Sequence, residues 1–395
     1  MQVTLANWRT APFNRWAFHH VRELVPSADI ANDPRAVRAL PTESLDFKAL
    51  RIDPDSGEAM GMEAFLRETD TDGMAILRRG RLVFERYGNG MTDETPHILM
   101  SVSKSMLGLL IHELGLDTER RVIDLLPEMK NTAYRDASVR HLLDMRAGIV
   151  WDENYLATSG LIVEYRKATG WNALGPGEIP SDLKSFVATL KETRPHGGPL
   201  HYVSPNSDLL GWIVERATGR RYAELMSERV WKKIGAERCA YITVDRLGAP
   251  RAAGGICATV RDLALLGQLL VQGGARDGRQ IVPAEWIEDI LRNGAPAAWH
   301  EGSFAPFFPD LPMHYRAQWY VERHAAPVMF GLGVYGQYLF VFPEQEVVIA
   351  KVSSQPPPLD SSQIALMTRA AAAIRQWLGP LSKPDHRAGA VQEQI

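Results

Sequence analysis

The sequence is poor in cysteine and has no long hydrophobic run. Its 395 residues include only Cys239 and Cys257, too few for a disulfide framework or a cysteine-based zinc site. We expect two ordinary buried thiols, with one disulfide between them as the alternative. No stretch approaches the roughly 18 apolar residues of a membrane-spanning helix, and the first residues lack the apolar segment of a signal peptide. We therefore expect a soluble, cytoplasmic protein.

An excess of positive charge is also missing. The formal net charge is -3 at pH 7, whereas proteins that bind nucleic acids or anionic membranes normally carry a basic excess. We expect neither kind of partner. What the chain does have is a hydrophobic content of 45%, which is enough for more core than one typical domain contains.

Strand-like segments lie towards both ends of the chain, and helical segments lie between them. Alternating apolar runs predict hairpins over 73–88 and 336–354 and a strand over 316–323. Apolar residues at helical spacing predict helices over 101–115, 181–193, 206–218, 221–234, 259–273, 283–293 and 361–378. This order predicts an α/β protein with one sheet built from both ends of the chain and a helical domain inserted between them. The predicted parts are an α/β sheet domain over 1–105 and 250–380, a helical domain over 106–249 and a disordered tail over 381–395.

The first candidate for chemistry is Ser101-Val102-Ser103-Lys104, at the start of the predicted helix 101–115. Residues three apart lie on one face of a helix, so Ser101 and Lys104 can touch. A serine hydroxyl needs a base to become a nucleophile, and a lysine can be that base when burial or another cation lowers its pKa. Free N–H groups at a helix start also favour a developing oxyanion. The pattern indicates Ser101 as nucleophile and Lys104 as its base.

Simpler interpretations of this segment stay open. Any serine and lysine at this spacing fit S-x-x-K, and a capping serine followed by a solvated lysine is the common case. Ser103 is a second candidate nucleophile, but its partner at the same spacing is Met106, which cannot transfer a proton. We therefore expect Ser103 to be a packing or capping residue.

A second candidate group is His201-Tyr202-Val203-Ser204, just before the predicted helix 206–218. A tyrosine beside an ammonium loses its proton more easily, so Tyr202 can act as a general base. A core tyrosine with one hydrogen-bond partner is the simpler interpretation. His201 is the rival base, but a serine–histidine pair predicts the elbow motif G-x-S-x-G, which the sequence lacks. We expect His201 to be structural or to line the cleft.

A glycine-rich segment, Gly331-Leu332-Gly333-Val334-Tyr335-Gly336, leads into the late hairpin. Glycine lets a backbone approach a ligand closely. A backbone N–H in this segment can therefore form the second half of an oxyanion hole. A plain turn before an edge strand is the alternative.

Taken together and in this order, the three segments resemble the serine beta-lactamase and penicillin-recognising superfamily, especially its class C and esterase branch. The similarity is greatest to the nylon-oligomer hydrolases and runs from residue 14 to about residue 370. The resemblance implies a beta-lactamase-like two-domain α/β fold, in which helices flank an antiparallel sheet and a mostly helical domain is inserted. The matching segments are Met100–Ser105, Leu142–Ile149, Tyr202-x-Ser204-x-Asn206, Gly254–Leu263, Gln318-Trp319 and Gly333-x-x-Gly336-Gln337.

The resemblance also implies a role for individual residues. Ser101 would attack a carbonyl and form an acyl-enzyme, while Lys104 and Tyr202 share the proton and pass it to the leaving group. The backbone N–H groups of Ser101 and Val334 would hold the oxyanion. No metal and no cofactor are implied. The residues implied to bind the substrate are Tyr155, Ser204, Trp319 and Tyr320.

The sequence departs from the family pattern in three places. The third motif lacks K-T-G, and no Lys or His stands just before Gly331, where a basic residue grips the carboxylate of a beta-lactam. This argues against strong beta-lactamase activity. Ala253 stands where the nylon-oligomer hydrolases carry a polar side chain, and Arg166 falls near a position where they gain selectivity from an acidic residue. Ester hydrolysis needs less help than amide hydrolysis because a good leaving group departs more easily.

The function we expect is that of a serine hydrolase acting on small carboxylic esters, linear amides or both, as a monomer or homodimer. A beta-lactamase or D-amino-peptide hydrolase is one alternative. The other is a non-catalytic, penicillin-binding-like module that captures a ligand, and acylation of Ser101 without turnover would favour it.

Overall fold

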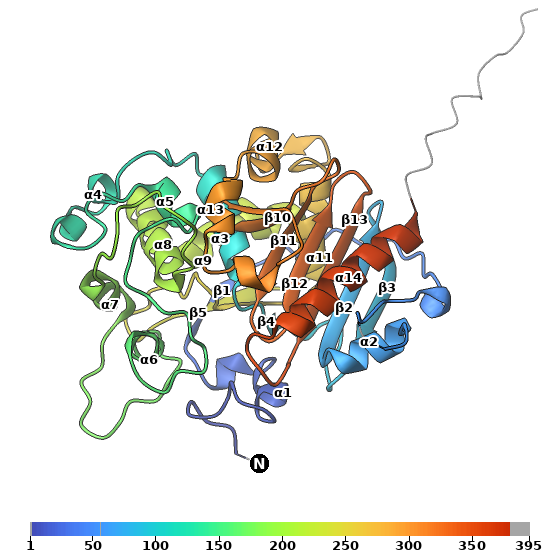
Figure 1. The fold of residues 1–395 in the computed structure, drawn as a ribbon, viewed down its shortest axis with the longest axis horizontal. Coiled ribbons are helices and arrows are strands. Elements are labelled where there is room, and N and C mark those ends of the chain that lie inside the picture. The colour runs from blue at the N-terminus through green and yellow to red at the C-terminus, as the bar shows by residue number, and fades with distance from the viewer. Residues whose placement is uncertain (1, 56, 380–395) are drawn as a thin grey trace, which may run out of the picture.

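The computed structural model describes residues 2–55 and 57–379, and its largest feature is a seven-stranded antiparallel sheet (Figure 1). Its order is β3-β2-β13-β12-β11-β10-β9, so strands from both ends of the chain lie side by side. This confirms the predicted sheet and the hairpins predicted over 73–88 and 336–354. The strands are β2 Thr71–Arg78, β3 Arg81–Tyr87, β9 Met313–Arg316, β10 Trp319–Glu322, β11 Val328–Gly333, β12 Gln337–Phe342 and β13 Val347–Ser353.

The strand predicted over 316–323 is present but shorter, since β10 covers Trp319–Glu322 and Arg316 ends the preceding strand β9. Ala317 and Gln318 have φ angles of 51° and 69° and form a turn between β9 and β10. The Ala317 N–H donates to the Asp144 carboxylate at 2.8 Å, and Gln318 Nε2 donates to the Leu143 carbonyl, also at 2.8 Å. These contacts with a distant segment fix the turn, and local apolar alternation does not reveal them.

A second, smaller antiparallel sheet does not follow from the sequence pattern. Its order is β1-β5-β6-β4, and its strands of two to four residues are too short to show alternation. It positions the candidate site, because the Leu99 N–H donates to the Ile256 carbonyl at 2.8 Å just before Ser101. The strands are β1 Ser27–Ile30, β4 His97–Ile98, β5 Ala240–Thr243 and β6 Ile256–Ala258, and a separate hairpin joins β7 Ala275–Arg276 to β8 Arg279–Gln280.

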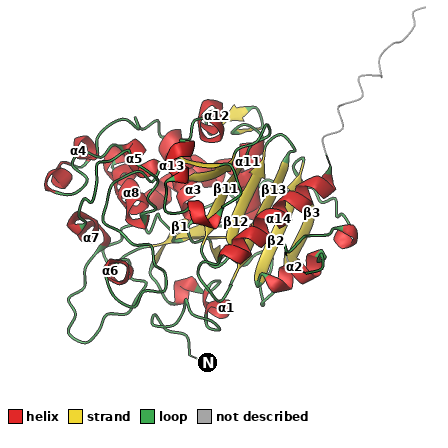
Figure 2. Cartoon of the chain, viewed as in Figure 1, coloured by secondary structure: helices red, strands yellow, loops and turns green. Residues whose placement is uncertain are grey.

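Helices cover both faces of the large sheet (Figure 2), and α4 to α9 form a block beside it (Figure 1). Side chains of β2 alternate between two cores: Ala75 and Leu77 pack in the core that includes α11, while Met74 and Ile76 pack in the core that includes α14. The helices are α1 Asn14–Ala17, α2 Met62–Glu68, α3 Val102–Glu113, α4 Val122–Leu125, α5 Val139–Leu143, α6 Leu161–Ala168, α7 Leu183–Thr189, α8 Ser204–Thr218, α9 Tyr222–Met226, α10 Lys232–Ile234, α11 Val260–Val271, α12 Ala284–Arg292, α13 Pro296–His300 and α14 Ser361–Leu378.

Each predicted helix corresponds to a helix of the structure, with two differences. The helix predicted over 181–193 ends at Thr189, and the one predicted over 221–234 contains a π turn at Ser227–Trp231 between α9 and α10. The predicted tail 381–395 lies outside the described residues. The proposed domain boundaries stay a prediction.

Both cysteines are free thiols, but only Cys257 is buried and Cys239 is exposed. The expectation of two buried thiols is therefore wrong for Cys239. None of the helices described here is long and apolar enough to cross a membrane.

Candidate active site

Ser101 stands immediately before α3, at the N-cap position. Its backbone is already nearly helical, with φ -68° and ψ -7°, and its side chain makes no capping hydrogen bond. The preceding Met100 has a φ of 46°, a left-handed conformation that is costly for a residue other than glycine. The Ser101 hydroxyl is therefore not occupied by capping, and the chain enters α3 through a sharp, strained bend.

Lys104 lies one helical turn further along α3 and contacts Ser101 directly. Its Nζ donates to Ser101 Oγ at 2.8 Å and to the Ala253 carbonyl at 2.7 Å. The lysine is only 1% exposed. Burial lowers its pKa to about 7, Glu153 opposes that shift and Arg251 adds to it. Near neutral pH a large share of Lys104 is therefore the free amine, which can accept the Ser101 proton.

Tyr202 lies in the loop that leads into α8 and is 3% exposed. The Lys104 nitrogen is 5.0 Å from the centre of the Tyr202 ring. The Tyr202 ring also stacks on the ring of Phe304, with 4.5 Å between the two ring centres. Burial raises the pKa of the Tyr202 hydroxyl, an effect that neighbouring Ser101 partly offsets. Tyr202 therefore keeps its proton at neutral pH, which suits a proton donor better than the base expected from the sequence.

The end of β11 lies against the start of α3. A Cβ on Gly333 would come within 2.6 Å of the Leu99 carbonyl oxygen and 3.0 Å of Met100 Cβ, so only glycine allows this approach. The approach brings Val334 into the wall of the same pocket as Ser101. Within the described ranges, neither the Ser101 nor the Val334 N–H donates to a backbone carbonyl. Both N–H groups are available to an oxyanion.

The two rival residues have structural positions. Ser103 is fully buried, and its hydroxyl accepts a hydrogen bond from the Ile256 N–H at 3.1 Å. His201 donates its backbone N–H to the Met145 carbonyl at 2.7 Å, and burial lowers the pKa of its imidazole. Neither residue is in the wall of the pocket that contains Ser101.

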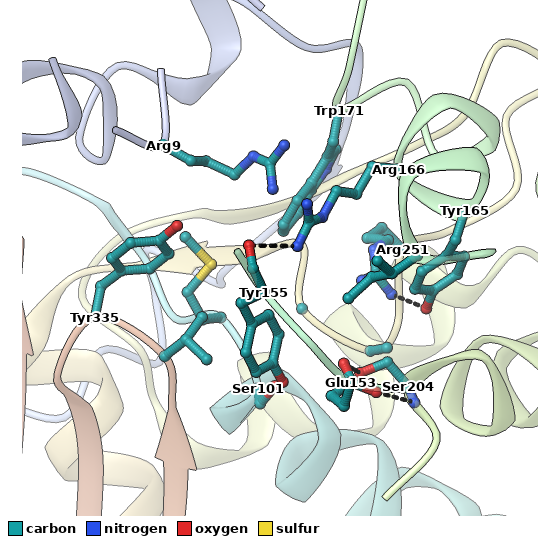
Figure 3. Close-up of a pocket in the computed structure, with 15 residues that line it drawn as sticks. Arg9, Ser101, Glu153, Tyr155, Tyr165, Arg166, Trp171, Ser204, Arg251 and Tyr335 are labelled. Atoms are coloured by element: carbon teal, nitrogen blue, oxygen red, sulfur yellow. Dashed lines mark hydrogen bonds between the residues drawn. The ribbon is translucent and has the colours of Figure 1, made fainter. Parts of the chain in front are cut away.

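The pocket above Ser101 is closed on one side by Glu153 and Tyr155 (Figure 3). Glu153 accepts hydrogen bonds from the Ser204 hydroxyl at 2.7 Å and the Ser204 N–H at 3.0 Å. The ring of Tyr155 extends towards Ser101 (Figure 3). The structure thus brings Tyr155 and Ser204 to the pocket, and it shows that Ser204 is held by Glu153, a residue that the sequence reasoning did not single out.

Trp319 and Tyr320 are adjacent on β10 and point to opposite faces of the sheet. Trp319 is fully buried in the core that includes α11, away from the pocket wall. Tyr320 is 2% exposed and lies behind Tyr202, with 6.5 Å between the ring centres. The structure therefore places Tyr320 in contact with the catalytic candidates and Trp319 in the core, and neither lines the pocket.

A buried polar network fixes the carbonyl that orients Lys104. Asp208 accepts from the Ala253 N–H at 2.9 Å and from Arg251 at 2.6 Å, and Tyr165 also donates to it. Ala253 itself is 1% exposed. The methyl side chain of Ala253 therefore matters less here than its backbone, which links Asp208 to Lys104.

The remaining pocket wall comes from segments far apart in the sequence. Trp8 Nε1 donates to the Trp171 carbonyl at 2.9 Å and so brings Arg9 to the pocket. Tyr335 enters from the turn after β11, where its φ is 65°. Arg166 lines the pocket as well. Apart from Arg166, no sequence signal pointed to these residues, because only tertiary packing brings them together.

Comparisons with known proteins agree with this geometry. The sequence matches the Beta-lactamase family over residues 62–374. It is 37% identical over 361 residues to the 6-aminohexanoate-dimer hydrolase of Paenarthrobacter ureafaciens, covering 90% of this chain and 89% of that one. A Bacillus anthracis structure, provisionally given the same name, matches with a TM-score of 0.87 and 27% identity over 95% of this chain and 97% of that one. EstCE1, a hydrolase with promiscuous acyltransferase activity, shares the fold with a TM-score of 0.61 and 16% identity over 79% and 96% of the two chains.

Proposed function

The chain belongs to the beta-lactamase family and is a hydrolase, and we propose that it cleaves carboxylic esters or linear amides through an acyl-enzyme on Ser101. The observation that carries this proposal is the 2.8 Å contact between Ser101 Oγ and the buried amine of Lys104. A serine with a neutral lysine in hydrogen-bond contact is an activated nucleophile.

The first half of the proposed reaction forms the acyl-enzyme. Ser101 Oγ attacks the carbonyl carbon while Lys104 takes the hydroxyl proton. The carbonyl oxygen becomes an oxyanion, which the N–H groups of Ser101 and Val334 stabilise. When the intermediate collapses, the bond to the leaving oxygen or nitrogen breaks, Tyr202 gives its proton to the leaving group and recovers one from Lys104.

Water completes the cycle in the second half. It attacks the acyl carbon, gives a proton to Lys104, and the carboxylic acid leaves as Ser101 regains its hydrogen through the same two groups. The 2.7 Å bond from Lys104 to the Ala253 carbonyl keeps the amine directed at Ser101 throughout.

Linear amides enter the proposal through similarity to the 6-aminohexanoate-dimer hydrolase. Esters are included because an alcohol or phenol is a better leaving group than an amine, so its departure depends less on proton transfer from Tyr202.

The test is to incubate the protein with 4-nitrophenyl butyrate, the linear 6-aminohexanoate dimer and nitrocefin, each with Ser101→Ala as control. We expect ester turnover, with or without amide turnover, and a loss of roughly 10³-fold or more in the variant. Undiminished turnover in Ser101→Ala would contradict the proposal. Turnover of nitrocefin alone would instead favour a beta-lactamase.

A further inference from the structure

The outer part of the pocket carries two guanidinium groups that form no ion pair with a described acidic side chain. Arg9 and Arg166 both line it. Among the residues that the structure describes, no Asp or Glu oxygen lies within 4.0 Å of either side chain, whereas the third arginine of the pocket, Arg251, pairs with Asp208 at 2.6 Å. Arg166 is buried and Arg9 is partly buried, and withdrawing an arginine from water without a counter-ion is costly. The two arginines therefore need an explanation.

Arg166 is 9% exposed, so water solvates little of its side chain. Its Nη2 donates to the Tyr155 carbonyl at 2.9 Å, and Nη1 donates a longer bond to the Ala157 carbonyl at 3.4 Å. A guanidinium has five N–H donors. Donors remain for a ligand, and in Figure 3 the group extends into the space between Tyr155 and Trp171.

Arg9 approaches the same space from the opposite wall (Figure 3). One of its nitrogens donates to Asn172, and its Nε is buried without a hydrogen-bond partner. Its guanidinium lies 5.5 Å from the Trp8 ring centre and 5.9 Å from the Trp171 ring centre. Burial is the main cause that lowers the pKa of Arg9 to about 10, and the charge of Arg166 adds to it. The two cations are thus close enough to repel each other, and an anion between them would relieve that repulsion.

The acidic group of the pocket is placed differently. Glu153 lies beside Ser204 at the end nearer Ser101 (Figure 3). Its carboxylate is occupied by the Ser204 N–H and hydroxyl and by the Trp151 indole, which donates at 2.5 Å. Among the described residues Glu153 forms no ion pair with Arg9 or Arg166, although its charge acts on Arg166 from a distance. The pocket is polarised, with positive charge at the end away from the nucleophile.

We propose that the substrate carries a carboxylate, which binds between Arg9 and Arg166 while the scissile carbonyl lies at Ser101. This inference rests on the proposed function and specifies its substrate class: esters or amides that bear a carboxylate rather than those that bear none. Arginine suits this role because its planar fork of donors matches a carboxylate. The carboxylate belongs either to the acyl part or to the leaving group.

Two matched sets of esters distinguish these positions. For the acyl part, the 4-nitrophenyl esters of hexanoic acid, adipic acid and 6-aminohexanoic acid each have a six-carbon acyl chain. The first two end at carbon 6 in a methyl and a carboxylate group, and the third carries an ammonium group on carbon 6. For the leaving group, 4-carboxyphenyl acetate is compared with 4-carbamoylphenyl acetate. We expect the anionic member of one set to have a kcat/KM about tenfold to a hundredfold above the neutral one, the range of a charge-assisted hydrogen bond.

The arginine variants then locate the effect. In Arg9→Gln and in Arg166→Gln the anionic-to-neutral ratio should fall severalfold, while Arg166→Lys should retain part of it. The matched control is Arg35→Gln, because Arg35 is exposed and outside the pocket, and its ratio should equal that of the unmodified protein. Each ratio is measured within one variant, so partial loss of folded protein cancels.

Two results would overturn the inference and leave the proposed function standing. One is Ser101-dependent turnover without an anionic preference in either set, and the other is a preference that both Gln variants retain. Undiminished turnover in Ser101→Ala, by contrast, would remove the proposed function itself.

Discussion

Two buried lysines of this chain make the same kinds of contact, with a serine hydroxyl and an aromatic ring, but lie in different parts of the fold. Lys104 is 1% exposed, donates to Ser101 and faces the Tyr202 ring at 5.0 Å. Lys351, on β13, is fully buried, donates to Ser353 and faces the Phe65 ring at 5.9 Å. Burial lowers the pKa of each lysine to about 7.

The difference lies in what surrounds each pair. Ser101 stands at the start of a helix and lines the pocket, whereas Ser353 is fully buried within the sheet. The ring near Lys104 bears a hydroxyl that can give a proton, and the ring near Lys351 does not. A lowered lysine pKa therefore does not by itself mark an active site. The site also requires a pocket, a nearby oxyanion hole and a proton donor.

The sharpest way to break this comparison is to replace each lysine with methionine. Lys104→Met should lose about 10²- to 10⁴-fold in kcat, the range of a lost general base. Lys351→Met should keep a kcat close to that of the unmodified protein, because Lys351 contacts no part of the pocket. The measurement is 4-nitrophenyl butyrate turnover per folded molecule, with folding checked by circular dichroism. Equal losses in the two variants would show that the lysine at Ser101 has no special role.

Removing the Tyr202 hydroxyl makes the aromatic ring beside Lys104 like the one beside Lys351. Tyr202→Phe gives Lys104 the same kind of neighbour that Lys351 has in Phe65. We expect a loss of about 10²-fold or more on amides and alkyl esters, where the leaving group needs a proton. The loss on 4-nitrophenyl esters should be smaller, about tenfold or less, since nitrophenolate leaves unprotonated. A uniform loss on both substrate classes would mean that Tyr202 positions other groups instead of donating the proton.

The pH profile tests the same lysine through its charge. The pKa of Lys104 is lowered to about 7, so the active free amine predominates above that pH and the ammonium below it. We therefore expect kcat/KM to rise with pH, with a change of about tenfold per unit below pH 7 and a plateau above it. The Lys351→Met variant, which keeps Lys104 in contact with Ser101, should give the same curve. A flat profile in the unmodified protein would assign the base to another group.

The contact between Ser101 and Lys104 could be predicted from the sequence because it is local. Ser101 and Lys104 are three residues apart on one helix, so spacing alone places them together. Singling out Tyr202 required the order of the three motifs along the chain. Its protonation state could not be predicted, because burial beside Phe304 and Tyr320 raises the pKa of its hydroxyl. Alternation predicted the hairpins that β2 forms with β3 and β12 with β13, but it did not predict β9 or β11 of the same sheet.

The wall of the pocket could not be predicted in the same way. Arg9 reaches it because Trp8 packs on Trp171, a contact between residues 163 apart in sequence. Tyr335 reaches it through a left-handed turn whose residue type gives no warning. The smaller sheet is made of strands too short for a periodic signal. Local pattern therefore predicted the residues that we propose do the chemistry, and tertiary contacts decide the residues that we propose bind the substrate carboxylate.

The most direct test of the central claim is to identify the residue that carries the acyl group. The protein is mixed with excess 4-nitrophenyl butyrate, quenched in acid during turnover and digested, and the peptides are fragmented in the mass spectrometer. We expect a butyryl group on Ser101 that is absent from Ser101→Ala. A butyryl group on Ser103 or another residue, or an equal amount of adduct in Ser101→Ala, would contradict that claim.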